Sequence, residues 1–158
     1  MKQFNNRSFT LIELVIVISI TLLLFSAGFL KLLDYRQHQA LKLTKQNIAA
    51  VLRNAQNLSI SQESGNRWGI HFENPSGSGN DFYELFSGVS YSTSTVISKN
   101  NLDPELQFND PASGVSENII FLPLSGKLSA AASINISLVS DTSVSSTIII
   151  NANGQIEY

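Results

Sequence analysis

The sequence predicts an α+β protein in which one long amino-terminal helix packs on an antiparallel β-sheet head. Residues 9–30 form an apolar run that holds a single formal charge, and residues 31–61 contain neither proline nor glycine. Residues 62–158 break instead into short segments of alternating apolar and polar side chains. We therefore expect a helical half followed by a strand-rich half.

The first eight residues are polar and carry two cations, Lys2 and Arg7. The 22 residues that follow would form a helix about 33 Å long, which is enough to cross a bilayer. Positive charge before the span favours a cytoplasmic amino terminus and an exported carboxyl end, although two cations just beyond the span weaken this argument. A cleaved secretory signal is the alternative, but its apolar core is usually about 7–15 residues long. We expect a leader at 1–8 and a transmembrane helix at 9–30.

Glu13 is the single charge inside the apolar run, and an acid in a membrane helix costs ~3 kcal/mol on insertion scales. One explanation is that Glu13 lies near the lipid headgroups, since it is only about a turn into the run. The other is that it meets a cation. An amine newly exposed at Phe9, on this subunit or on a neighbour, would be such a cation.

The segment Arg-Ser-Phe-Thr-Leu-Ile-Glu-Leu-Val-Ile-Val-Ile at residues 7–18 resembles the type III signal of type IV pilins and type II secretion pseudopilins. The resemblance implies that a prepilin peptidase cuts between Ser8 and Phe9 and methylates the new amine of Phe9. It also implies a role for Glu13 in assembly. The family normally has glycine before the cut, and Ser8 retains a small residue there.

Residues 31–61 continue the helix as an amphipathic stem. One face of this helix carries Leu41, Ile48, Leu52 and Ala55, and it is widened by Val51, Leu58 and Ile60. We expect this face to pack against the sheet of the head. The stem carries five cations against Asp34, whereas residues 62–158 carry three cations against ten acids. A basic stem therefore bears an acidic head.

The head is expected to be a β-rich domain at 62–158. Strands are predicted at 67–73, 81–86, 89–98, 105–108, 118–122, 133–139, 146–151 and 155–158. The first should place Trp68, Ile70 and Phe72 inward and Arg67, Gly69, His71 and Glu73 outward. Turn residues at 75–80 predict a hairpin loop, and Asn153-Gly154 predicts a second hairpin with a type I′ turn.

Three head motifs resemble the minor pseudopilin H and FimT-like pilin domain. They are Trp-Gly-Ile-His-Phe at 68–72, Phe-Leu-Pro-Leu-Ser-Gly-Lys at 121–127, and a closing pattern of isoleucines and glycine that ends at Ile156. With the amino-terminal signal, the resemblance spans nearly the whole chain and implies a pilin-like fold.

The resemblance also implies a function: such subunits prime or tip a type II secretion pseudopilus or a type IV pilus. The partners it implies are prepilin peptidase, other pilin or pseudopilin subunits, an inner-membrane assembly platform and membrane lipid. The chain would be a single-pass protein of the cytoplasmic (inner) membrane, and after assembly part of a periplasmic or cell-surface filament.

The sequence offers no catalytic site and no cofactor or metal site. His38 and His71 are too few and too separated for a zinc site, and the chain has no cysteine. Gly77-Ser78-Gly79 lacks the ending of a phosphate-binding loop. The oxygen-bearing residues Asn100, Asn101, Asp103 and Glu105 do not follow EF-hand spacing, and Pro104 favours an ordinary turn. We expect a protein that is not an enzyme.

Two alternatives stay open. FimT-like pilins can bind transforming DNA through basic carboxyl-terminal residues, but residues 148–158 contain no lysine or arginine, and their one charge is Glu157. Because phosphate contacts need basic side chains, nucleic acid is not an expected partner. The other alternative is a single-span surface-binding protein that forms no filament, in which Glu13 would be incidental.

Coexpression with a prepilin peptidase is expected to remove residues 1–8 and leave a mature chain that begins at Phe9 with an N-methylated amine. The basic leader, the small Ser8 and the retained apolar helix are the reasons. Intact-mass measurement checks this expectation. Persistence of the full chain, or a chain that starts after Ala27, would contradict it.

Overall fold

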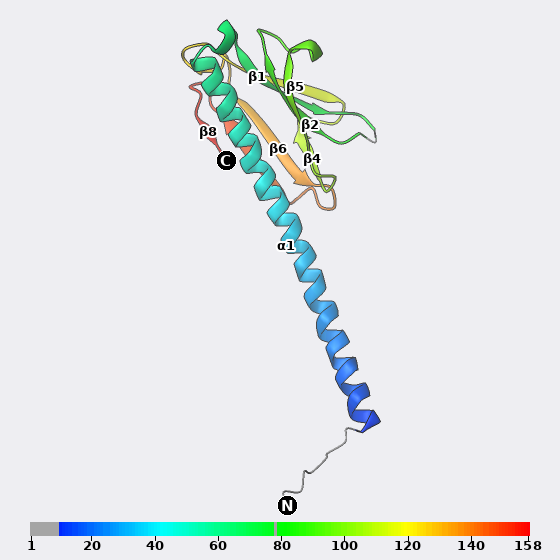
Figure 1. The fold of residues 1–158 in the computed structure, drawn as a ribbon. Helices are drawn as coiled ribbons and strands as arrows, with labels where there is room; N and C mark the ends of the chain where they lie inside the picture. Colours follow the sequence, from blue (N-terminus) through cyan, green and yellow to red (C-terminus); the bar gives the residue numbers. More distant parts are fainter. Residues whose placement is uncertain (1–9, 78) are drawn as a thin grey trace, which may run out of the picture. The chain divides into compact units, whose positions relative to one another are not determined.

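The computed structural model describes residues 10–77 and 79–158 of the chain (Figure 1). The chain forms two compact units, Met1–Arg36 and Gln37–Tyr158. The helix α1 spans Leu11–Ile60 without a break, as the sequence predicts for a helix that continues from the apolar run into the stem. Eight strands and two short 3₁₀ turns, Glu63–Gly65 and Thr93–Thr95, follow it in the described part of the chain.

Residues 11–25 of α1 expose large apolar side chains on every side of the helix, and Glu13 is their one charged residue. The exposed large apolar side chains of this segment are Leu11, Ile12, Leu14, Val15, Ile16, Val17, Ile18, Ile20, Leu22, Leu23, Leu24 and Phe25. The hydroxyls of Ser19 and Thr21 donate back to the carbonyls of Val15 and Val17, at 2.8 and 2.7 Å, and so stay within the helix. Among the described residues, no helix combines the length and apolar character that a membrane span requires. The transmembrane helix at 9–30 stays a prediction.

The stem in the second unit buries the predicted face. Leu41, Ile48, Leu52 and Ala55 are all buried in a core that they share with strands of the head. Ile60 is an exception, because it is exposed where α1 ends. At this end of the helix the buried side chain is that of Ser59 and not that of Ile60.

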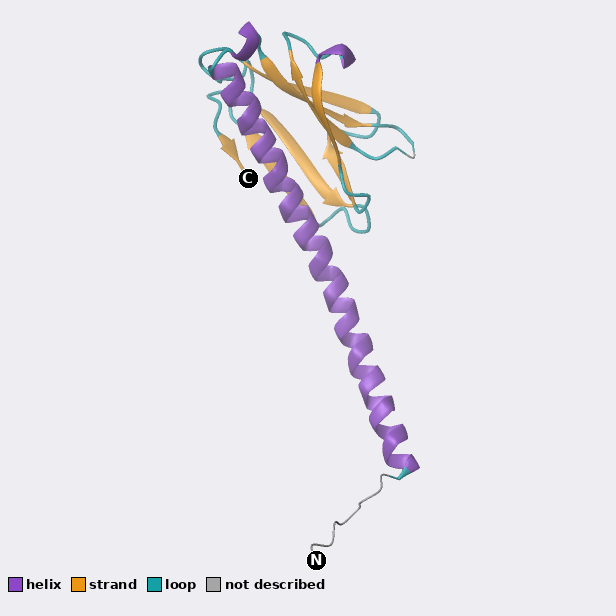
Figure 2. Ribbon diagram, viewed as in Figure 1, coloured by secondary structure: helices purple, strands orange, loops and turns teal. Residues whose placement is uncertain are grey.

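The head contains two antiparallel sheets where the sequence predicted one (Figure 2). The first has the order β3-β2-β1-β5 and the second β4-β6-β7-β8. The bounds are β1 Trp68–Asn74, β2 Phe82–Ser87, β3 Val96–Asn101, β4 Leu106–Asp110, β5 Val115–Phe121, β6 Ala132–Leu138, β7 Ser145–Ile150 and β8 Ile156–Glu157. The chain enters the second sheet at β4, returns to the first at β5, and re-enters the second at β6. Side-chain alternation does not reveal this interleaving.

The strand predicted at 89–98 is wrong in its first half. Residues 88–95 form a loop with a 3₁₀ turn, and β3 begins only at Val96. The loop covers the outer face of β1 and β2, where the Tyr91 ring meets Phe86 edge-on at a centroid distance of 5.5 Å. Gly69 lies under this ring pair: a Cβ there would come within 2.8 Å of the Phe86 ring. In this segment Tyr91 packs on the outer face of the sheet, whereas Val89 is exposed.

The carboxyl-terminal hairpin is confirmed, but its turn is not type I′. Gly154 has φ 90°, whereas Asn153 does not adopt positive φ. The Gly154 N–H donates to the Asn151 carbonyl at 2.8 Å, and the Asn151 N–H donates to the Gln155 carbonyl at 2.9 Å. This is the three-residue hairpin loop in which a type I turn is followed by a left-handed glycine.

Two polar side chains of the stem join the helix to the head. The Ser59 hydroxyl accepts the Trp68 N–H at 2.8 Å and lies 3.2 Å from the Phe121 carbonyl, between β1 and β5. The Gln56 Nε2 donates to the carbonyls of Gly126 and Gly154, at 2.9 and 2.7 Å. Both glycines have positive φ, and a Cβ on either would collide with the Gln56 side chain. The two turns therefore need glycine because the stem lies against them.

Gln56→Ala is expected to destabilise the chain by about 1–3 kcal/mol, because two partly buried carbonyls lose their donor. Urea unfolding should show a lower midpoint with an unchanged slope. The matched control is Asn57→Ala, which removes an exposed amide from the next position and should change stability by less than about 0.5 kcal/mol. Equal midpoints for the two variants would show that the Gln56 bonds contribute nothing.

Candidate functional site

The predicted cleavage and methylation site, Ser8 and Phe9, lies outside the described residues. The start of α1 is described, and Thr10 caps it. The Thr10 Oγ1 accepts the Glu13 N–H at 3.3 Å, and the Thr10 carbonyl accepts the Leu14 N–H at 3.2 Å. Glu13 therefore lies in the first helical turn, at the position that a capping box gives to glutamate. The Thr-x-x-Glu spacing at residues 10–13 is the sequence pattern of a capping box, and the expectations drawn from the sequence did not include it.

The Glu13 carboxylate has no ion-pair partner among the described residues. Its neighbours along the helix are exposed apolar side chains such as Ile12 and Leu14. An acid in the first turn gains about 0.3–1 kcal/mol from the helix dipole, whereas an acid in hydrocarbon costs ~3 kcal/mol. Capping and the dipole alone do not offset that cost. In apolar surroundings Glu13 needs a cation from outside the described residues.

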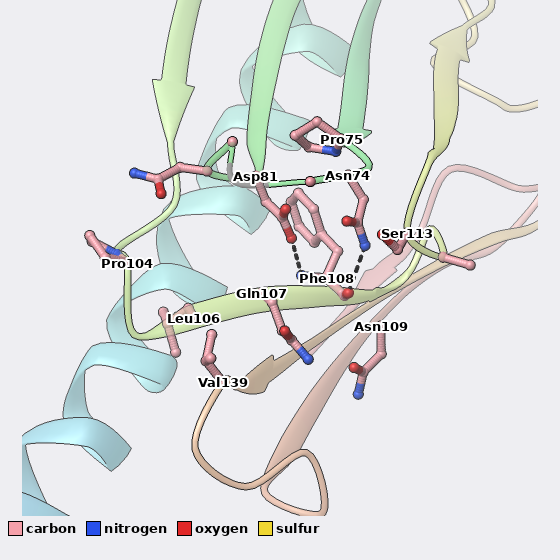
Figure 3. A pocket seen from close by; sticks show the side chains of 14 residues that line it. Asn74, Pro75, Asp81, Pro104, Leu106, Gln107, Phe108, Asn109, Ser113 and Val139 are labelled. Atoms are coloured by element: carbon pink, nitrogen blue, oxygen red, sulfur yellow. Dashed lines mark hydrogen bonds between the residues drawn. The ribbon is translucent and has the colours of Figure 1, made fainter.

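The head has a polar cavity of about 470 Å³ near the junction of its two sheets (Figure 3). The Asp81 Oδ2 accepts the Phe108 N–H at 2.5 Å. The Asn74 Nδ2 donates to the carbonyls of Phe108 and Pro111, each at 2.9 Å. Phe108 belongs to β4, while Asn74 ends β1 and Asp81 precedes β2, so these bonds tie the first sheet to the edge of the second.

The polar side chains that line this cavity are amides, the hydroxyl of Ser113 and the carboxyl group of Asp81. Burial raises the pKa of Asp81 above its usual value of 3.8, and the Phe108 N–H partly opposes the shift. The lining contains no lysine, arginine, histidine or cysteine. Two of its polar side chains, Asn74 and Asp81, join the first sheet to β4.

His71 was predicted on the outward side of a strand, and it is in fact only 4% exposed. The Tyr91 ring stacks on the imidazole at a centroid distance of 3.6 Å. The Nδ1 lies 2.8 Å from the Asn118 Oδ1, and the Nε2 lies 3.1 Å from the Glu73 Oε2. The side chain does project from the outer face of β1, but the loop at 88–95 covers that face.

The hydrogen bonds continue from Tyr91 across the outer face. The Tyr91 hydroxyl donates to the Glu84 Oε2 at 2.7 Å, and the Glu84 Oε1 pairs with the Lys99 Nζ at 3.3 Å. Burial, the bond to Glu84 and the nearby negative charges raise the pKa of Tyr91 to about 12. Each group has a partner within the cluster, so the cluster holds the loop onto the sheet.

The structure offers no metal centre in its described part, where no three histidine, cysteine, aspartate or glutamate side chains could hold an ion together. Of the residues weighed for calcium, Asn100 and Asn101 end strand β3, and Asp103 and Glu105 lie in the turn that follows, where the Asp103 Oδ1 accepts the Glu105 N–H at 3.0 Å. His38 is exposed on the stem and His71 is buried in β1.

Arg53, a cation of the stem, lies 4.9 Å over the Tyr158 ring and donates to its hydroxyl at 3.2 Å.

Comparisons with known proteins match the amino-terminal segment and the fold of the chain. Residues 3–29 match the prokaryotic N-terminal methylation motif. In structure the chain is similar to the type IV minor pilin FimU of Pseudomonas aeruginosa strain PAO1 in two crystal forms, each with 18% sequence identity. The TM-scores are 0.53 and 0.52, and the matches cover 74% of this chain and 90% or 86% of the FimU chain. No curated protein sequence matches significantly.

These findings confirm two predictions from the sequence. The α+β pilin-like fold is confirmed by the shared fold. The prediction of a type IV pilin-like protein with a prepilin-type signal is confirmed by the motif and the fold together.

The raised pKa of Asp81 predicts a pH-dependent difference between the wild type and Asp81→Asn. The folded chain binds this proton more tightly than the unfolded chain, so the wild type loses stability as pH rises from about 3.8 through the folded pKa. The variant keeps an acceptor for the Phe108 N–H and carries no charge. Its stability advantage should therefore grow with pH across this window and then level off.

Urea unfolding of both chains at several pH values checks this expectation. Asp141→Asn is the control with the opposite sign, because bonds from Ser143 lower the pKa of Asp141. For Asp141 the wild type should be favoured above about 3.8, and the difference should vanish as pH falls. An Asp81→Asn difference that is constant with pH would contradict the raised pKa.

Proposed function

We propose that this type IV pilin-like chain is a minor pilin or pseudopilin, a membrane-anchored structural subunit that assembles into or primes a type IV pilus or a type II secretion pseudopilus. One observation carries the proposal: residues 11–25 of α1 expose large apolar side chains on every side and carry one carboxylate, Glu13, with no ion-pair partner among the described residues. Such a helix belongs in apolar surroundings, and its one charge provides a specific contact for another subunit.

Processing by prepilin peptidase supplies the missing cation. Cleavage between Ser8 and Phe9 creates an amine four residues before Glu13, and methylation of Phe9 leaves that amine able to carry a proton. The motif match over residues 3–29 includes all three positions and supports this step. The amine would pair with Glu13 of the same subunit or of a neighbour, so that neither charge stays alone in hydrocarbon.

The apolar helix anchors the subunit in the inner membrane before assembly and packs beside neighbouring helices in the filament. The head lies outside the cytoplasm and presents its surface there. Its partners are prepilin peptidase, other pilin or pseudopilin subunits, the inner-membrane assembly platform and membrane lipid. The role is structural and not enzymatic, in keeping with a head whose histidine, tyrosine and carboxyl clusters bond to one another.

Two alternatives differ from this proposal in their requirements. A DNA-uptake pilin of the FimT-like kind would need exposed basic side chains near its carboxyl end, but the final strand β8 carries Glu157, and the stem cation beside it, Arg53, is engaged by Tyr158. A single-span protein that forms no filament would have no use for Glu13.

Replacement of Glu13 by Gln is expected to leave membrane insertion intact and to reduce incorporation into filaments at least about tenfold. Insertion should survive because loss of the charge lowers the hydrocarbon cost. Incorporation should fail because the Phe9 amine of a subunit loses its partner, and an uncompensated buried charge costs ~3–5 kcal/mol. Crosslinking of the variant to other pilins in membranes, with an insertion assay alongside, measures both effects.

The matched control is Glu63→Gln, which removes one carboxylate from an exposed 3₁₀ turn of the head. This variant should crosslink as the wild type does. If the Glu13 and Glu63 variants crosslink equally well, Glu13 is an interfacial residue of an ordinary membrane anchor, and the pairing with the Phe9 amine is wrong.

A further inference from the structure

The two sheets of the head end in four strand edges: β3 and β5 in the first sheet, and β4 and β8 in the second. An edge strand pairs readily with a strand from another chain unless something blocks it. We propose that the free edge of β5 is a docking site for an extended, basic segment of a partner protein, which adds to the sheet as a further strand. This proposal concerns the head alone and does not rest on the role of Glu13.

The other three edges are protected. Along β4, Asp81 and Asn74 occupy the N–H and the carbonyl of Phe108. The strand β8 is only two residues long. The strand β3 carries Lys99, and its pairing with β2 has a register shift between Leu85 and Phe86. Side-chain blocking, short length, lysine and irregular pairing are the usual means of preventing strand addition.

The strand β5 has none of these features. It runs for seven residues with no lysine, proline or glycine, and its pairing with β1 shows no register shift. Val115 at its start is 52% exposed. A long, regular and partly apolar edge of this kind is the type that accepts an added strand.

The backbone of β5 offers its hydrogen-bonding groups in the right direction. The Arg67 carbonyl faces β2, where it accepts the Gly88 N–H, and the Asn74 carbonyl faces β5, where it accepts the Gly114 N–H. By the alternation of an antiparallel ladder, the N–H and carbonyl groups that point away from β1 are those of Ser116, Asn118 and Ile120. Among the described residues, no backbone hydrogen bond links these groups to another segment.

A small groove lies beside part of this edge. Its volume is about 210 Å³, and its two walls are residues 117–120 of β5 and residues 128–132. The second wall is built largely of small side chains, Ser129, Ala130, Ala131 and Ala132. Neighbouring strands lie about 4.8 Å apart, so small side chains opposite β5 permit the close approach that pairing requires.

The charge of the groove indicates a basic partner. Glu117 lines it, no lysine or arginine does, and neither Glu117 nor Asp110 has an ion pair among the described residues. Burial and the nearby Asp110 raise the pKa of Glu117, the direction expected for a carboxylate beside another acid and with no cation paired to it. A second copy of β5 would bring another glutamate and no cation, so the complementary strand comes from a different sequence.

The test uses the full chain in detergent micelles and a blocked eight-residue peptide of alternating valine and lysine. Hydrogen exchange followed by NMR reports the amides of residues 116, 118 and 120. The lysine peptide should slow exchange of these amides by about tenfold or more at saturation, because each gains a cross-strand bond. A peptide with glutamate in place of lysine should give no protection.

Two test variants and one control variant separate the backbone contribution from the charge. Ser116→Pro removes one outward N–H at an edge position where proline is tolerated, and it should abolish protection. Asn101→Pro is the matched control at the free edge of β3 and should leave protection intact. Glu117→Gln, which keeps the backbone, should weaken binding of the lysine peptide about fivefold, the upper range for a surface ion pair.

The proposal is overturned if the glutamate peptide protects equally well, or if Ser116→Pro folds and still shows full protection. It is also overturned if the same amides become protected with rising protein concentration in the absence of peptide. That result would make a second copy of this chain the occupant.

Discussion

The hydrogen bonds that Ser59 and Gln56 make from the stem are the interaction on which the arrangement of the head depends. Ser59 satisfies backbone groups where β1 and β5 diverge, and Gln56 holds the turn before β6 and the turn between β7 and β8. Buried backbone groups must find partners, so a single turn of helix determines where parts of both sheets lie. The apolar stem face, with Ile48 and Leu52 at its centre, is covered by the strands positioned in this way.

The rest of the head meets the same requirement with side chains from one sheet that satisfy the other. Asn74 and Asp81 occupy the outer edge of β4, and the loop that carries Tyr91 covers a histidine on the outer face of β1. Both arrangements use side chains, among them Asp81 and His71, of types that often act as catalytic groups or metal ligands. Their bonds to one another explain why the head has a structural character, and they leave β5 as the edge without such protection.

Residues 11–25 of α1 differ from the head, because their large apolar side chains are exposed on every side of the helix. Their one charged residue, Glu13, has no ion-pair partner in the described chain. The dipole and the Thr10 cap account for about 1 kcal/mol, less than the ~3 kcal/mol that an acid costs in hydrocarbon. In the proposed filament, lipid would cover these apolar side chains, and an amine of the processed terminus, of the same subunit or of a neighbour, would pair with Glu13.

The sequence by itself determined the features that depend on neighbours along the chain. These are the unbroken helix, its buried face through Leu41, Ile48 and Leu52, the turn at 75–80, the closing hairpin and most strands, because periodicity and turn residues act locally. Only the tertiary structure decided that β4 and β5 belong to different sheets, that His71 is buried, and that Gly154 and not Asn153 takes positive φ. Each of these depends on pairing or contact with another segment: β4 with β6 and β5 with β1, Tyr91 over His71, and Gln56 against Gly154. The alternation of residue types along the chain carries no record of such contacts.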